Sequence, residues 1–170
     1  MNKSLRCLAA LTCGSVLALA LILAVPSASR AADSAMPADK ARCVVCGMFV
    51  AKYANWLARI ELASGGPLFF DGVKDLMAFH FSPESYGHKK DSITSIWVKD
   101  YYTLAWIPAN QAHFVVGSDV HGPMGHEFVP FATAEAAASF LKDHQGREVL
   151  RFGQITQAMV ESMRSGHTMK

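Results

Sequence analysis

Two thiols and a thioether lie within six positions of one another in residues 42–49, RCVVCGMF. The donors are Cys43, Cys46 and Met48, and polarizable sulfur of this kind selects soft ions such as Cu(I) over harder ones. If the segment is extended, Cys46 and Met48 point the same way, because side-chain direction in a strand repeats every two residues. The spacing therefore indicates a soft-metal site, although a single methionine more often fills a core.

A second group of donors lies in residues 118–126, SDVHGPMGH, between two predicted strands. His121 and His126 flank Met124, so the segment offers imidazole nitrogen and thioether sulfur, both good copper ligands. A loop tip is a poor place to bury an apolar side chain for stability. We therefore predict that this loop supplies ligands, and we treat the other histidines as ordinary surface or core residues.

Three other uses of the Cys43/Cys46 pair were weighed. A c-type haem site needs histidine directly after the second cysteine, and Gly47 stands there instead. A structural zinc site needs four ligands, and histidines would have to complete it. A dithiol redox site usually begins a helix that lowers a thiol pKa, and no clear helix start follows Gly47. The oxidoreductase and zinc readings stay open as alternatives.

The N-terminus has the layout of an export signal. Lys3 and Arg6 precede an apolar run over about residues 7–25, and small residues surround Ala31. This pattern predicts a signal peptide, residues 1–31, or alternatively an uncleaved anchor. Either form exports the rest of the chain and predicts a periplasmic location.

Removal of the signal changes both charge and thiol content. Basic residues fall from 16 to 13 against 14 acidic ones, so the formal charge moves from +2 to −1. Nothing in this balance indicates nucleic-acid binding. Cys7 and Cys13 leave with the signal, and Cys43 and Cys46 remain. In an oxidising compartment such a pair forms a disulfide or is held reduced.

The remaining residues predict an α+β fold. Residues 32–42 are small and polar and read as a tether. Asp71 and Thr133 are suited to cap two helices, and Gly146 to end the second. The tail 158–170 is polar and is predicted to be flexible. Strands are predicted at about 55–63, 68–70, 95–98, 113–117, 127–131 and 149–152.

Both halves of this region show the same order of strand, turn, strand, helix, strand. We therefore predict two tandem ββαβ units, about 43–102 and 103–157, within one domain spanning 43–157. Each unit is small, and packing the two together buries more apolar surface than either can bury alone.

The chain resembles the NosL family over about residues 41–157. The likeness is carried by CVVCGM, by FFDGVKDLMAF, and most specifically by VVGSDVHGPMGHEFVPFATAEAAASFLKDHQGREVLRFGQI. The resemblance implies an exported copper chaperone of denitrifying bacteria, not an enzyme, built from two ββαβ units. It also implies that the protein binds Cu(I) and supplies the copper–sulfide cluster of apo nitrous-oxide reductase, beside a membrane transporter complex.

The resemblance further implies ligation by cysteine, methionine and histidine. Carried onto this sequence, the candidates are Cys43 or Cys46, Met48 or Met124, and His121 or His126. Many family members are lipoproteins anchored by a cysteine. Cys13 lies in no convincing attachment motif, so we expect any membrane anchoring to occur through the unprocessed N-terminus.

Overall fold

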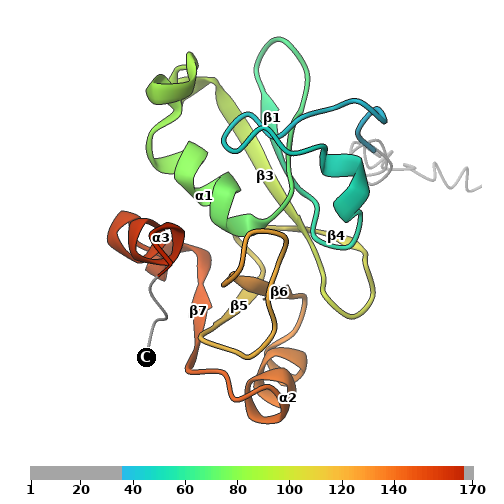
Figure 1. Ribbon diagram of the computed structural model, residues 1–170, viewed down its shortest axis with the longest axis vertical. Helices are drawn as coiled ribbons and strands as arrows, with labels where there is room; N and C mark the ends of the chain where they lie inside the picture. The colour runs from blue at the N-terminus through green and yellow to red at the C-terminus, as the bar shows by residue number, and fades with distance from the viewer. Residues whose placement is uncertain (1–35, 167–170) are drawn as a thin grey trace, which may run out of the picture.

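The computed structural model of the protein describes residues 36–166, so the predicted signal, residues 1–31, lies outside the described part. Two antiparallel sheets, each with a helix packed on it, form two units stacked along the long axis (Figure 1). No helix within 36–166 is long and apolar enough to cross a membrane. The elements in chain order are β1 (Ala58–Leu62), β2 (Leu68–Phe70), α1 (Val73–Phe81), β3 (Ile93–Lys99), β4 (Trp106–Pro108), β5 (His113–Val116), β6 (Val129–Phe131), α2 (Ala134–Asp143), β7 (Glu148–Arg151) and α3 (Gln157–Arg164).

The two sheets repeat one topology. In the first, β1 pairs antiparallel with β2 and β3; in the second, β5 pairs antiparallel with β6 and β7. The strand orders are β2-β1-β3-β4 and β6-β5-β7. The prediction of an α+β fold made of two ββαβ units is therefore confirmed. β4 lies beyond the expected boundary at 102/103, yet it pairs with β3 and so belongs to the first sheet.

Strand β5 joins the two units because both of its faces are buried. Phe114 and Val116 lie in the larger core cluster, which also contains Leu76 and Phe79 of α1. Val115 points to the opposite face, as strand alternation requires, and packs with Phe140 of α2. The second sheet is thus sandwiched between the first unit and its own helix. This arrangement brings the loops of the second unit against α1.

A buried carboxylate fixes the seam between the units at the end of β3. Asp100 is 3% exposed, and its Oδ2 accepts a hydrogen bond of 2.6 Å from the Ala132 amide of the second unit. Its Oδ1 accepts from the Thr103 amide at 2.7 Å. Burying a carboxylate is costly unless such donors surround it, and here the donors come from both units.

The helix starts follow two different rules. α2 begins as predicted, because Thr133 Oγ1 accepts a hydrogen bond of 3.1 Å from the Ala136 amide. α1 begins at Val73 after Gly72, and no side chain at that cap position binds its amides. The prediction that Asp71 caps α1 is therefore wrong, and the carboxylate serves another purpose described below.

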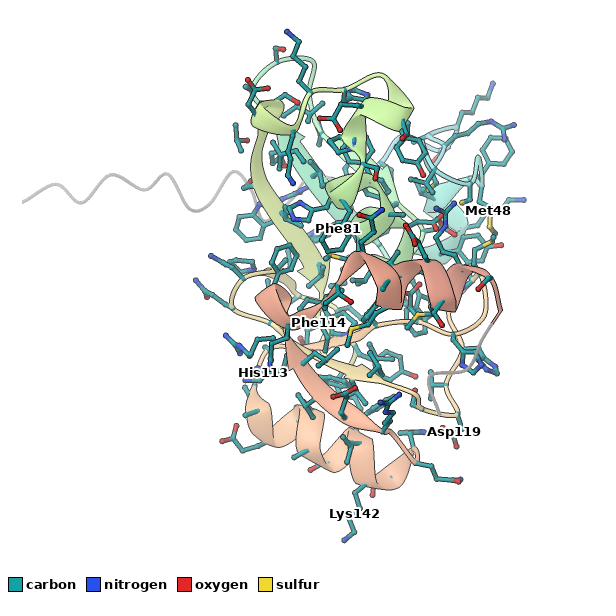
Figure 2. All side chains as sticks on the ribbon, turned by 90° about the vertical axis from the view of Figure 1, so that its left-hand side faces the viewer. Met48, Phe81, His113, Phe114, Asp119 and Lys142 are labelled. Atoms are coloured by element: carbon teal, nitrogen blue, oxygen red, sulfur yellow. The ribbon has the colours of Figure 1, made fainter. Side chains whose placement is uncertain are left out.

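The C-terminal tail is not flexible where the structure describes it. Residues 157–164 form α3, which Thr156 caps through a 3.3 Å hydrogen bond from the Met159 amide. Val160 and Met163 are buried, one helical turn apart, in the core cluster that includes α1. Figure 2 shows α3 crossing between Phe81 and Phe114. The prediction of a flexible tail failed because a polar sequence with two apolar residues on one face still forms a helix when a partner covers that face.

We expect Met163→Ala to lower the free energy of unfolding by about 2–3 kcal/mol, because a fully buried methionine leaves a cavity when truncated. Glu161→Ala, an exposed position of the same helix, should change it by less than about 0.5 kcal/mol. Urea denaturation followed by circular dichroism measures both. Equal effects of the two substitutions would mean that α3 does not pack on α1 in solution.

Candidate metal site

The cysteine pair lies on a tight turn, so the condition under which Cys46 and Met48 would point the same way, an extended segment, is not met. The Gly47 amide donates to the Cys43 carbonyl at 2.8 Å, and the Cys43 amide donates to the Met48 carbonyl at 2.9 Å. Gly47 has a φ of 78°, a left-handed conformation that glycine adopts without a steric penalty. Arg42 Nη1 closes the turn by donating to the Gly47 carbonyl at 2.7 Å. Strand alternation therefore does not relate Cys46 to Met48.

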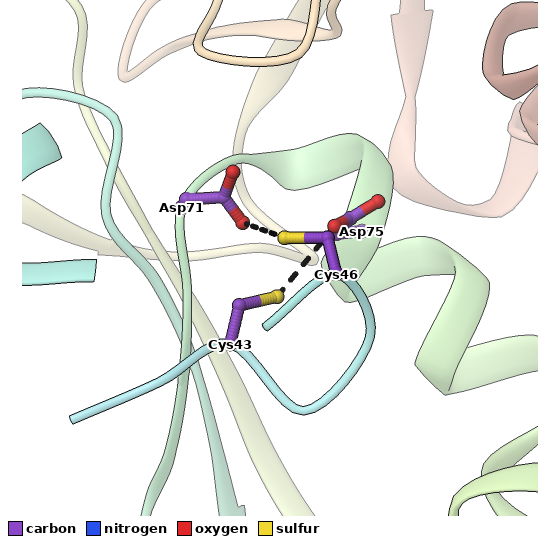
Figure 3. Close-up of side chains that lie close together, drawn as sticks. All are labelled: Cys43, Cys46, Asp71 and Asp75. Carbon is purple, nitrogen blue, oxygen red and sulfur yellow. Dashed lines mark hydrogen bonds between the residues drawn. The ribbon is translucent and has the colours of Figure 1, made fainter. Parts of the chain in front are cut away.

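The turn aims both thiols at two carboxylates beside the start of α1 (Figure 3). Cys46 Sγ lies 3.1 Å from Asp71 Oδ1, and Cys43 Sγ lies 3.5 Å from Asp75 Oδ2, both as hydrogen bonds from thiol to carboxylate. One donor atom from each of the four residues lies within 4.8 Å of every other. Two sulfur and two oxygen donors at such distances are suited to hold a single metal ion.

Burial keeps the thiols protonated when no metal is bound. Cys43 is 2% exposed, and its desolvation, with the charge of Asp75 adding to it, raises its pKa to about 12. The pKa of Cys46 is raised as well, first by desolvation and then by its hydrogen bonds to Asp75 and Asp71. The thiolate is the form that binds metal, so a metal ion must displace these protons to bind.

The second predicted group, His121, Met124 and His126, lies on the loop between β5 and β6. The two imidazole rings are 4.6 Å apart, and Met124 is 48% exposed. Burial, with the charges of His121 and Lys74, lowers the pKa of His126. A neutral imidazole has a free lone pair and is the form that binds metal. The lowered pKa of His126 therefore favours the form of this side chain that can bind a metal.

Both groups of donors are attached to the same turn of α1. Lys74 Nζ donates to the Met124 carbonyl at 2.7 Å and to the His126 carbonyl at 2.9 Å, and Lys74 lies between Asp71 and Asp75 in the chain. In Figure 1 the loop between β5 and β6 reaches the start of α1. The two histidines nevertheless do not belong to the four-residue cluster around the thiols.

Met48, the remaining predicted donor, joins the cysteine turn through its backbone. It is half-buried, its carbonyl closes the cysteine turn, and Figure 2 shows it at the edge of the molecule. Of the six predicted donors, the structure thus brings together Cys43 with Cys46 and His121 with His126. The start of α1 links the two groups, since Asp75 binds Cys43 and Lys74 binds the loop.

Several residues of this region were missed at the level of sequence. Asp71 and Asp75 are four positions apart, a spacing that places two carboxylates on one side of a helix start, and this signal was available. Arg164, at the end of α3, lies with Nε 3.9 Å from Asp75 Oδ1, which no local pattern indicates. Glu127 accepts a hydrogen bond of 2.6 Å from the Lys74 amide, and it too carries no sequence signal.

A sequence model of the NosL family matches residues 35–160. The chain belongs to the NosL family. It is 35% identical over 127 residues to the copper-binding lipoprotein NosL of Achromobacter cycloclastes, covering 68% of this chain and 63% of that protein. It is 30% identical over 135 residues to the copper-binding lipoprotein NosL of Stutzerimonas stutzeri, covering 75% and 68%.

A solved structure of the NosL family has the same fold. The crystal structure of the copper chaperone NosL from Shewanella denitrificans matches with a TM-score of 0.63 at 28% identity, covering 74% of this chain and 98% of that one. The match confirms the α+β architecture of the NosL domain and its duplicated sheets. The chain spans 63% of the length of the Achromobacter relative.

We expect the metal-free thiols of this NosL domain to react slowly with iodoacetamide at pH 8. A pKa of about 12 leaves little Cys43 thiolate, so its alkylation should be about 100-fold or more slower than that of a cysteine in a short peptide. Asp71→Asn should speed the reaction of Cys46, because it removes a carboxylate that raises the pKa of this thiol.

Mass spectrometry of the alkylated peptides measures both rates. The matched control is Asp119→Asn, which removes a carboxylate that binds His144 at 3.0 Å and lies outside the cluster. That substitution should leave both rates unchanged. Rapid alkylation of the unmodified protein would show that its thiols are ionised, as in a dithiol oxidoreductase.

Proposed function

We propose that this protein is an exported Cu(I) carrier that delivers copper to apo nitrous-oxide reductase for assembly of its copper–sulfide cluster. The observation that carries the proposal is the pair of thiols held against two carboxylates, with all four donor atoms within 4.8 Å. The names of the three relatives, two copper-binding lipoproteins and a copper chaperone, support the metal. The delivery step and the reductase follow from the family resemblance.

The two sulfurs explain why the ion would be monovalent. Thiolates are soft ligands that favour Cu(I), and two of them satisfy its preference for few ligands. Asp71 and Asp75 are hard donors, and in this proposal they accept hydrogen bonds from the protonated thiols of the empty site and hold the sulfurs in place. Met124 or Met48, together with His121 or His126, would complete the ligand set or pass the ion onward. A site with few ligands can pass its ion to a partner, whereas a closed cage holds it.

The thiol environment argues against a redox enzyme. Reactive Cys-x-x-Cys pairs have lowered pKa values, commonly because a helix N-terminus or a positive charge stabilises the thiolate. Here both thiols face carboxylates, and the pKa of each is raised. A carrier role, without catalysis, is therefore the function that the geometry supports best.

The proposed location is the periplasm. It is supported by the export pattern of residues 1–31 and by the lipoprotein names of two relatives. In that compartment the partners would be the apo-reductase and the membrane transporter complex for its maturation.

We expect anaerobically purified protein to bind one Cu(I) and Cys46→Ser to weaken that binding by more than about 100-fold, which is beyond the loss typical of residues outside the ligand shell. Competition with a Cu(I)-specific chelator measures the affinity, and metal analysis identifies the ion retained. Met77→Leu, a volume-conserving change at a buried methionine that is not one of the four cluster residues, is the control and should not alter binding. Unchanged affinity in Cys46→Ser would defeat the assignment.

We expect Cu(I) affinity to rise with pH between 6 and 8. Each displaced thiol proton tightens binding about tenfold per pH unit, as long as the pH stays below the pKa of the metal-free thiol, which for Cys43 is about 12. Two displaced protons give a slope of about two in log affinity, and Cys43→Ser should reduce it by about one. A chelator titration at several pH values, corrected for the chelator's own protonation, checks this. A flat profile would mean that copper binds elsewhere.

A further inference from the structure

The loop between β5 and β6 is fastened to α1 by hydrogen bonds in both directions. Lys74, which is 3% exposed, sends its ammonium out to the Met124 and His126 carbonyls at 2.7 and 2.9 Å. Glu127, which is 4% exposed, returns a carboxylate oxygen that accepts from the Lys74 amide at 2.6 Å and the Phe128 amide at 2.9 Å. The loop is thus tied to α1 by charge-assisted bonds from Lys74 to two of its backbone carbonyls and by the buried side chain of Glu127.

Two glycines make room for the Glu127 carboxylate. A Cβ added at Gly72 would lie 2.2 Å from Glu127 Oε2, and one added at Gly122 would lie 3.1 Å from Glu127 Cγ. Gly72 has a φ of −171°, extended backbone that any residue adopts, so this glycine is required by the close approach and not by its conformation. The carboxylate therefore sits in a socket formed by the start of α1 on one side and the loop on the other.

Glu127 also accepts a hydrogen bond that the side chain of a cap residue usually accepts. An amide in the first turn of a helix has no partner within the helix, and a side chain just before the helix usually accepts from it. At α1 the acceptor comes from the second unit, so Asp71 is left to face Cys46 at 3.1 Å. The loop and the thiol site are therefore linked through one helix turn.

We propose that Lys74 and Glu127 are positioning residues that hold the Met124 loop at the thiol–carboxylate site, so that the two groups of donors act on one ion. This inference rests on the proposed Cu(I)-binding function. Neither residue is proposed as a ligand. They act through Met124 and through Asp71, whose placements depend on the loop and on the helix start.

A double-mutant cycle between Lys74 and Met124 tests the proposal. Lys74→Met keeps the length of the buried stem and removes the ammonium. Met124→Leu removes the thioether and keeps most of the side-chain volume. Cu(I) affinity is measured by chelator competition for the unmodified protein, both single variants and the double variant.

In the original background, Met124→Leu should weaken Cu(I) binding about tenfold or more, and Lys74→Met by about 10- to 100-fold. In the Lys74→Met background the Met124 substitution should have little further effect, because the loop is already released. Additive losses, or no effect of Met124→Leu in the original background, would overturn the proposal.

A second variant keeps the test valid if Lys74→Met does not fold. Gly72→Ala leaves the backbone unstrained and pushes the Glu127 carboxylate out of its socket. It should give the same coupling to Met124→Leu. The matched control is Asp100→Ala, which removes a different buried carboxylate that bonds amides across the two units. It should lower stability and leave the tenfold effect of Met124→Leu intact.

Amide hydrogen exchange of the metal-free protein measures how firmly Lys74 and Glu127 hold the loop when no copper is present. Residues 121–128 should exchange faster in Lys74→Met and Gly72→Ala than in the unmodified protein or in Asp100→Ala, and unchanged exchange would overturn the proposal. The proposed function fails separately, if the unmodified protein binds no Cu(I) or if Cys46→Ser binds it as tightly.

Discussion

A helix start leaves amide hydrogens without partners inside the helix, and at α1 one of them is bonded from across the molecule by Glu127. The arrangement of the whole region depends on that bond. This bond leaves Asp71 available to the thiol of Cys46. Together with the hydrogen bond from Lys74 to the Met124 carbonyl, it holds the loop that carries Met124. Since a buried carboxylate is stable only with such donors, the loop and the helix start hold each other in place.

The duplicated fold explains how this contact arises. Each sheet has a hairpin of its first two strands, a helix, and a third strand on the other side of the first. Because β5 is buried on both faces, the second sheet packs against α1 as well as α2. The hairpin loop of the second unit consequently meets the helix start of the first. A single unit would have the helix start but no loop from a second unit to contact it. The contact between the loop and α1 therefore requires both units.

The sequence predicted the features that depend on local pattern. The strand periodicity, the Thr133 cap and the repeat of two ββαβ units are all local or nearest-neighbour properties, and the structure confirms them. The failures have tertiary causes. Asp71 resembles a cap, yet a distant carboxylate does that work. The polar tail gains a helix because α1 covers Val160 and Met163.

The candidate site shows the same difference between features set by local sequence and features set by tertiary contacts. The donor types Cys43 and Cys46 could be identified from their spacing, because two thiols so close together have few uses. Their turn depends on the left-handed Gly47, which a strand pattern cannot anticipate. Asp71 and Asp75 carried a usable signal in their spacing. Lys74 and Glu127 carried none, because hydrogen bonds between distant segments leave no periodic trace in either one.

The protonation state of the thiols bears directly on how a carrier of this design would exchange its ion. A site whose thiols are already ionised needs no deprotonation to bind copper. When it is empty, however, it must hold two uncompensated negative charges beside two carboxylates. Here the raised pKa values of Cys43 and Cys46 keep the empty site neutral at sulfur. If copper binds as proposed, its entry expels protons from the two thiols and its exit takes them back, and in the empty site Asp71 and Asp75 accept hydrogen bonds from the protonated thiols. Each proton that returns offsets part of the cost of breaking a copper–sulfur bond, which makes release to a partner easier than from a site of bare thiolates.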